Sequence, residues 1–211
     1  MNRLNKNYFL TPSLKWFQKY YYSYKRDESR KLKEAEEVLT ALNLNLAGAP
    51  VLEIGPANGY FLDVCMKHGA KSAGFIDIDP YFYYYLKVKG YKEGILGNHW
   101  KAVHKLKGQK YSLIYSKGAM IVDDLLMRRE RSFAMMSEWL SALEKATVNG
   151  GVIVICPHWR DVPASAKRQY TGNILENDFV KFILEKGYSP LKFIEGHNIE
   201  PNYPVTFWKR V

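Results

Sequence analysis

The stretch VLEIGPANGYF at residues 51–61 decides the fold of this chain. An apolar run leads into two glycines and a small residue, and the pattern then turns aromatic at once. A strand that ends in Gly-x-Ala-x-Gly and enters a helix brings backbone close to a ligand, because glycine has no Cβ in the way. The next strand-like run, GFIDIDP at 74–80, ends in Asp77 and Asp79. A carboxylate there can accept hydrogen bonds from both hydroxyls of a ribose, so residues 51–79 predict a site for an adenosine-containing ligand.

From residue 50 onward, short apolar runs alternate with longer amphipathic segments. The apolar runs are at 51–55, 72–78, 93–97, 111–116 and 151–156, and we expect helices at 59–69, 80–89, 99–107 and 128–147. Continuously apolar runs are typical of strands buried on both faces, and the alternation predicts a parallel sheet with helices on both faces. The NGG sequence at 149–151 predicts a turn that leads into the fifth strand.

The C-terminal part of the chain departs from this alternation. After a helix expected near 174–187, the runs SPLKFIEGHN (189–198) and YPVTFWKRV (203–211) are separated by a loop alone. Neighbouring strands joined without a crossover helix are usually antiparallel. We therefore expect the last strand to be antiparallel.

Residues 1–48 show no strand-like alternation, and we interpret them as a helical N-terminal extension to a domain at 49–211. Asp27 is placed to cap a helix whose apolar positions recur at helical spacing, at Leu32, Ala35, Val38, Leu39 and Leu42. The preceding segment, WFQKYYYSYKR at 16–26, is dense in tyrosine and cations. Such a segment suits a nucleic-acid platform, a lid over a small-molecule pocket, or a packed helix.

The formal net charge of +10 favours anionic partners, although a basic solvated surface would give the same value. No apolar run approaches the roughly 20 residues that cross a bilayer, and the N-terminus has no signal-peptide core, so we expect a cytoplasmic protein without a transmembrane segment. Cys65 and Cys156 lie in apolar segments and are expected to be buried free thiols. No Cys/His cluster has zinc spacing, so we expect no metal.

The loop departs from the dinucleotide pattern. Dinucleotide-binding folds need G-x-G-x-x-G, with a helix N-terminus facing a pyrophosphate. Here no third glycine follows Gly59 at that spacing, and Glu53 stands two residues before the first glycine. A carboxylate would repel a pyrophosphate, so the site suits an adenosine ligand that carries a cationic group.

VLEIGPANG followed by GFIDIDP resembles the glycine-rich motif and the acidic second-strand motif of the class I S-adenosylmethionine-dependent methyltransferases. The resemblance covers about 49–211 and includes ILGNHW, YSLIYSKGAM, NGGVIVI and the terminal two-strand unit. It implies a Rossmann-like, seven-stranded, mostly parallel α/β sheet with helices on both faces and an antiparallel last strand. Ala57 stands where the family usually has glycine and adds one methyl group.

The resemblance also implies S-adenosyl-L-methionine as the cofactor and S-adenosyl-L-homocysteine as its product. Glu53 would orient the cofactor's ammonium group, Asp77 would hold the ribose hydroxyls, and Ile78 would pack on the adenine. Loop backbone would pass close to the methionine part at Gly55, Pro56, Ala57 and Gly59.

Further residues follow the third, fourth and fifth strands. By the same resemblance, Asn98 and His99 would face the adenine edge, and Ser116 would lie near the sulfonium. Methyl transfer needs a general base only where the acceptor is a hydroxyl or a protonated amine. His158, which titrates near neutrality and follows a strand end, is our first candidate for that base, and Asp123 is the second.

These features predict an enzyme that methylates an oxygen or nitrogen of a small molecule or sugar-like metabolite. The fourth strand ends in YSKGAM and lacks the Asn/Asp-Pro-Pro-aromatic run of amino-methylating DNA enzymes. Two alternatives stay open. The basic charge and the N-terminal tyrosines suit an RNA- or ribosome-directed methyltransferase, and Ala57 suits a non-catalytic partner subunit with the same fold. The acceptor and the oligomeric state do not follow from the sequence.

Deletion of residues 1–26 tests whether the N-terminal segment closes over the site. The segment has too few apolar residues for its own core, whereas tyrosine and tryptophan give a pocket an apolar wall with polar tips. We expect the truncated protein to keep the far-ultraviolet circular dichroism of a folded sheet and to lose most of its methyl transfer. Full activity after truncation would identify the segment as an appendage.

Overall fold

The computed structural model describes residues 18, 21–23, 25–106, 108–121, 129–158, 178–191, 198–200, 203–204 and 206–211. Its main element is a seven-stranded sheet with the order β3-β2-β1-β4-β5-β9-β6. The strands are β1 (Pro50–Ile54), β2 (Ser72–Asp77), β3 (Glu93–Leu96), β4 (Tyr111–Ile121), β5 (Thr147–His158), β6 (Ser189–Leu191) and β9 (Thr206–Arg210). A separate antiparallel pair joins β7 (Asn198–Glu200) to β8 (Tyr203–Pro204).

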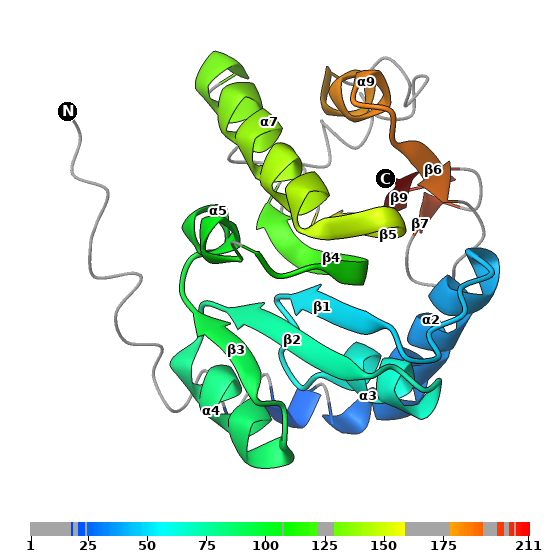
Figure 1. The fold of residues 1–211 in the computed structure, drawn as a ribbon, viewed down its shortest axis with the longest axis vertical. Helices are drawn as coiled ribbons and strands as arrows, with labels where there is room; N and C mark the ends of the chain where they lie inside the picture. The colour runs from blue at the N-terminus through cyan, green and yellow to red at the C-terminus, as the bar shows by residue number, and fades with distance from the viewer. Residues whose placement is uncertain are drawn as a thin grey trace.

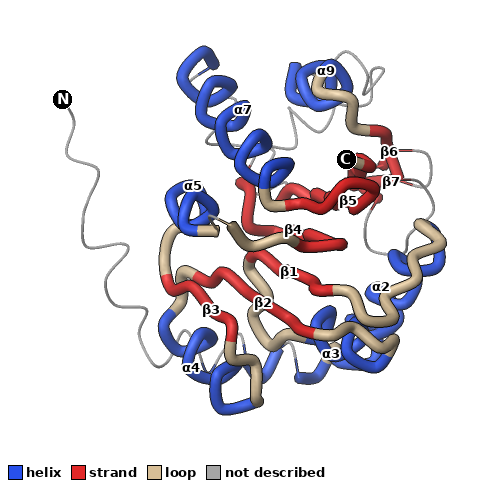
Figure 2. The backbone as a smooth tube through the Cα atoms, viewed as in Figure 1, coloured by secondary structure: helices blue, strands red, loops and turns tan. Residues whose placement is uncertain are grey.

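Helices cover both faces of this sheet (Figure 1). They are α2 (Glu28–Ala41), α3 (Tyr60–Lys67), α4 (Pro80–Lys89), α5 (His99–Ala102) with the 3-10 turn η2 (Val103–Lys105), α7 (Arg129–Lys145) and α9 (Asp178–Glu185). Helices α5, α7 and α9 lie on one face, and α2, α3 and α4 lie on the other. Figure 2 shows the strands as a red layer between the blue helices. Within the described ranges, no helix has the length and apolar composition needed to cross a membrane.

The strand directions confirm the predicted fold class. Strands β1 to β5 are parallel. Strand β9 lies between β5 and β6 and is antiparallel to both. The two terminal runs joined without a helix therefore pair as expected, and the sheet is Rossmann-like with one reversed strand near its end.

Burial on both faces explains why the strand sequences are continuously apolar. In β1, Leu52 and Ile54 pack with α7 and α9 in one core, while Val51 packs with α2 and α3 in the other. Neighbouring residues of a strand point to opposite faces, so a strand covered on both sides needs apolar residues at every position. Cys65 and Cys156 are buried free thiols, as predicted.

Helix α2 is part of the core rather than a free extension. Its apolar positions, Ala35, Val38 and Leu39, are buried against α3 and β1. The predicted cap is wrong: the Asp27 side chain makes no cap hydrogen bond and pairs with Arg30 at 3.2 Å. Helical residues already precede Asp27, so its carboxylate does not face the first turn of α2. The division at residue 48 stays a prediction, since most of residues 1–24 lie outside the described ranges.

Two further elements differ from expectation. The helix expected at 99–107 is the short α5 followed by η2. The NGG sequence lies inside β5, because Thr147 pairs with Tyr111 and Val152 pairs with Leu113, so that four residues of β5 oppose one of β4. Gly150 has a φ of 79° within this bulge, which suits glycine.

Gly94 should be sensitive to the addition of a single methyl group. It pairs with Phe75 of the neighbouring strand, and a Cβ at residue 94 would lie 2.4 Å from the Phe75 ring. We expect Gly94→Ala to lower the free energy of unfolding by about 1–3 kcal/mol in urea denaturation. The double variant Phe75→Leu/Gly94→Ala should lose less than the sum of the two single losses, because leucine removes the close contact. Additive losses would contradict this cause.

Candidate functional site

The loop between β1 and α3 lies against the end of β2. The backbone N–H of Gly55 donates to the Ile76 carbonyl at 2.8 Å, and that of Ala57 donates to Asp77 Oδ2 at 3.3 Å. Gly55, Ala57 and Gly59 have φ angles of 74°, 48° and 72°. Three left-handed residues at alternate positions turn the chain sharply from the strand into the helix.

Two positions of the loop have distinct steric demands. A Cβ at Gly59 would lie 2.6 Å from a methyl of Leu86, so this glycine is required by helix packing as well as by its φ angle. Ala57 has a left-handed conformation that costs an L-residue about 1–2 kcal/mol. Its hydrogen bond to Asp77 holds it there.

Asp77 is buried at the last position of β2. Its carboxylate accepts the N–H of Ala57 and, at 2.8 Å, the N–H of Asp79. Burial raises the pKa of Asp77 to about 7, and the backbone N–H donors act in the opposite direction. The adjacent Ile78 is 43% exposed, which leaves an apolar side chain open beside the carboxylate.

Glu53 is buried near the end of β1, on the face that α3 covers. It accepts a hydrogen bond from the backbone of Leu62, and its Oε2 atom has no partner among the described residues. Burial raises the pKa of Glu53 to about 8, with smaller contributions in the same direction from Asp63 and Asp77. A cationic ligand group beside it would stabilise the ionised form.

The ends of β3 and β4 supply three more predicted residues. Asn98 caps α5, since its Oδ1 accepts the Trp100 N–H at 2.9 Å. The His99 ring lies 4.8 Å from that of Trp100 and 5.9 Å from that of Trp139, and burial lowers the pKa of His99 to about 4. Ser116 is buried at the level of Ile54 in β1.

The strand register brings these residues to one edge of the sheet. Ile54 pairs with Ile76 and with Ser116, and Asp77 pairs with Leu96, so the ends of β1 to β4 are contiguous. In the described part of the chain, buried side-chain polar atoms without a partner occur at this edge on Glu53, Asn58, Asp79, His99 and Ser116, and elsewhere on Trp139 and Tyr188. Buried polar groups are normally hydrogen-bonded. Their concentration here marks an edge suited to a polar ligand.

Asn58 and Lys89 belong to the site and were not predicted. Asn58 is buried in the loop, where its Nδ2 contacts the Tyr60 hydroxyl at 3.3 Å. The Lys89 ammonium donates to the Asn58 carbonyl at 3.0 Å and contacts the Asp63 carboxylate. Asn58 could have been found from its place inside the glycine motif, whereas Lys89, from the end of α4, has no signal in the sequence.

Lys89 also lies among tyrosines that connect the loop with the N-terminal segment. Its ammonium is 5.6 Å from the ring centroid of Tyr60 and 6.0 Å from that of Tyr85. The Tyr21 ring meets Tyr85 edge-on at 5.4 Å, and the Tyr21 carbonyl is 3.5 Å from Asn58 Nδ2. The segment around Tyr21 therefore lies against the loop.

Neither candidate base can be placed fully. The backbone of His158 pairs with Ile121 at the end of β5. Its side chain and the whole of Asp123 lie outside the described residues, so both roles stay predictions. No group of three or more His, Cys, Asp or Glu in the described ranges is arranged to hold a metal ion.

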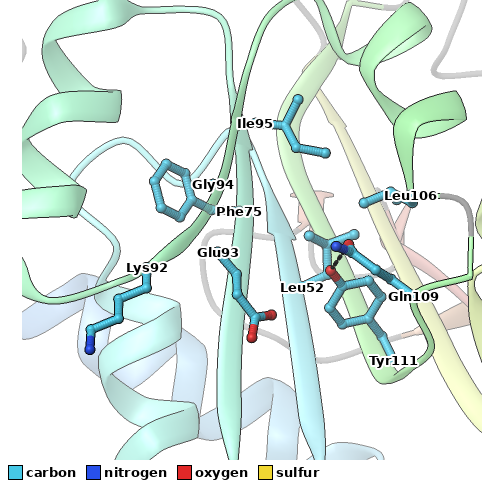
Figure 3. A pocket seen from close by; sticks show the side chains of 9 residues that line it. All are labelled: Leu52, Phe75, Lys92, Glu93, Gly94, Ile95, Leu106, Gln109 and Tyr111. Carbon is cyan, nitrogen blue, oxygen red and sulfur yellow. Dashed lines mark hydrogen bonds between the residues drawn. The ribbon is translucent and has the colours of Figure 1, made fainter.

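A separate pocket of about 170 Å³ lies toward the amino ends of the strands (Figure 3). Its lining includes Glu93 and Tyr111, the first residues of β3 and β4. The Tyr111 hydroxyl is bonded to Gln109 at 2.7 Å, drawn as the dashed line. This pocket is remote from the glycine loop and shares none of the predicted site residues.

Glu53→Gln should stabilise the protein at alkaline pH. The carboxyl binds its proton more tightly in the folded state, with a pKa of about 8 against an ordinary 4.5, so its contribution is complete below pH 4.5 and is lost as the pH rises toward 8. We expect the glutamine variant to exceed the wild type by a few kcal/mol, of the order of 2, at pH 8.5 in urea denaturation without ligand. The difference should vanish near pH 4. A matched change at the exposed Glu185 should leave the pH profile unaltered, and an equal profile for Glu53→Gln would refute the raised pKa.

Comparison with models of known protein families gives no match, and comparison with curated protein sequences gives none. Solved structures do match. YjhP from E. coli is 17% identical, with 76% of this chain and 66% of that chain covered and a TM-score of 0.51. DesVI of Streptomyces venezuelae is 12% identical, with 71% and 59% covered and a TM-score of 0.50. The sugar N-methyltransferase KedS8 of a Streptoalloteichus species is 18% identical, with 66% and 53% covered and a TM-score of 0.50.

This chain thus spans between about half and two thirds of the length of the structures it resembles. At these identities the likeness concerns the fold. The seven-stranded sheet with its reversed strand β9, and the match to a sugar N-methyltransferase, agree on one architecture. The chain has the Rossmann-like fold of the class I S-adenosylmethionine-dependent methyltransferases.

Proposed function

We propose that this protein is an S-adenosylmethionine-dependent methyltransferase that acts on an oxygen or nitrogen of a small molecule or sugar-like metabolite. The observation that carries the proposal is the set of buried, unpartnered polar atoms at the carboxyl edge of the sheet, around the loop at 55–59, among the described residues. Ligands of open α/β sheets bind at this edge. The sugar N-methyltransferase KedS8 has the same fold, which supports the choice of acceptor class.

The residues present fit the parts of this cofactor. Glu53, buried with one free oxygen, suits the ammonium of the methionine part, because a cation would lower its raised pKa. Asp77 at the end of β2 suits the ribose hydroxyls, and the exposed Ile78 suits the adenine face. The side chain of His99 is neutral at pH 7, since burial lowers its pKa to about 4, so it would offer a neutral polar edge to the adenine.

When bound, the cofactor supplies a methyl group already activated by the sulfonium. The chain then mainly provides alignment and exclusion of water. The loop is held rigidly for that task, through Gly55 and Ala57 on β2 and through Lys89 on Asn58. A base near the fifth strand would accept the proton of a hydroxyl or ammonium acceptor, with His158 as the proposed group.

Isothermal titration with S-adenosylhomocysteine and NAD tests the proposal. We expect S-adenosylhomocysteine to bind and NAD to bind far more weakly, because Glu53 would repel a pyrophosphate. Asp77→Ala should weaken S-adenosylhomocysteine by about tenfold or more, the loss of hydrogen bonds to a charged group, while circular dichroism shows a folded protein. Tighter binding of NAD would overturn the proposal, and unchanged affinity in Asp77→Ala would transfer the ribose role to Asp79.

A further inference from the structure

A group of cations surrounds one buried carboxylate where α2 crosses the end of β4. Glu34 of α2 is 5% exposed, and its Oε2 contacts both the Lys117 ammonium at 2.5 Å and the Lys31 ammonium at 3.4 Å. Arg30 reaches the other oxygen, Oε1, at 2.9 Å and pairs with Asp27 on its outer side. Three cations thus meet two carboxylates, and only Glu34 lies at the centre.

The two lysines are held in this group at an electrostatic cost. The side chains of Lys31 and Lys117 are 23% and 25% exposed, respectively. The pKa of Lys31 is lowered, first by burial and then by the charge of Lys117, and the attraction of Glu34 does not compensate. Two partly buried ammonium groups that share one oxygen therefore leave excess positive charge, which a further anion would neutralise.

The position of the group along the sheet edge points to the methyl acceptor. The strands follow the order β2, β1, β4, β5, with Asp77 on β2, Glu53 on β1 and Lys117 on β4. Lys117 pairs with Cys156 of β5 and is two residues beyond Tyr115, the register partner of Glu53. If ribose lies at β2 and the ammonium at β1, a ligand group at Lys117 lies beyond the cofactor, on the acceptor side.

We infer that Lys31 and Lys117, with Arg30 at the rim, bind a carboxylate or phosphate group of the methyl acceptor, so that the acceptor is an anionic small molecule. The acceptor assignment rests on the proposed function. The ammonium groups act as point charges with several donors each, which suits the oxygens of either anion. Glu34 keeps the two lysines at the sheet edge while the site is empty of anion.

Isothermal titration with inorganic pyrophosphate at fixed ionic strength tests the inference, on protein saturated with S-adenosylhomocysteine. Lys117→Gln should weaken pyrophosphate by about tenfold or more. Glu34→Gln removes the competing carboxylate and should strengthen it by about threefold or more. Lys71→Gln, at an exposed lysine before β2, is the matched control and should leave the affinity unchanged. A purely structural ion network gives no reason for the two variants to move the affinity in opposite directions.

Three results would overturn the inference. One is failure of the wild-type protein to bind pyrophosphate, and another is an equal affinity in wild type, Lys117→Gln and Glu34→Gln. The third is competition, in which S-adenosylhomocysteine excludes pyrophosphate, since the anion would then be the cofactor's own carboxylate. If S-adenosylhomocysteine does not bind at all, the proposed function fails, and the same titrations without it still decide whether the cluster binds anions.

Discussion

The hydrogen bond from the Ala57 N–H to the buried carboxylate of Asp77 is the constraint on which the site depends. It fixes the loop after β1 to the end of β2, next to the bond from Gly55 to Ile76. With both bonds in place, the chain takes left-handed angles and enters α3 directly above Glu53. Burial of that glutamate and its raised pKa are consequences of this geometry.

The fold was predictable because its causes are local and periodic. Continuous apolar runs alternating with amphipathic segments specify strands covered on both faces, and Val51 and Leu52 show this division between the two cores. The place of the site was predictable for a related reason: parallel strands end at one edge, so residues that follow them, such as Asp77 and Ser116, must be near each other. What each residue binds stays a matter of proposal.

Features set by distant contacts escaped the sequence. The bulge at 148–151 depends on pairing with β4, and the contact of Lys89 with Asn58 joins residues that are 31 positions apart. Asn98 shows a different limit. Its side chain suits both a ligand and a helix cap, and the structure gives its oxygen to the Trp100 N–H. A residue type at a strand end therefore indicates a site more reliably than it indicates a role.

The reversed strand β9 affects how the molecule is assembled during synthesis. Strands β1 to β5 pair in the order in which they could be completed, with each new strand next to one already made, apart from the step from β3 back to β1. Strand β6 cannot join them by itself, because its partner in the sheet is β9, whose residues 206–210 are made later. Until then Ile153 and Ile155 form an open edge, exposed to the pairing with other chains that leads to aggregation. The late arrival of five residues therefore closes the sheet and ends that risk.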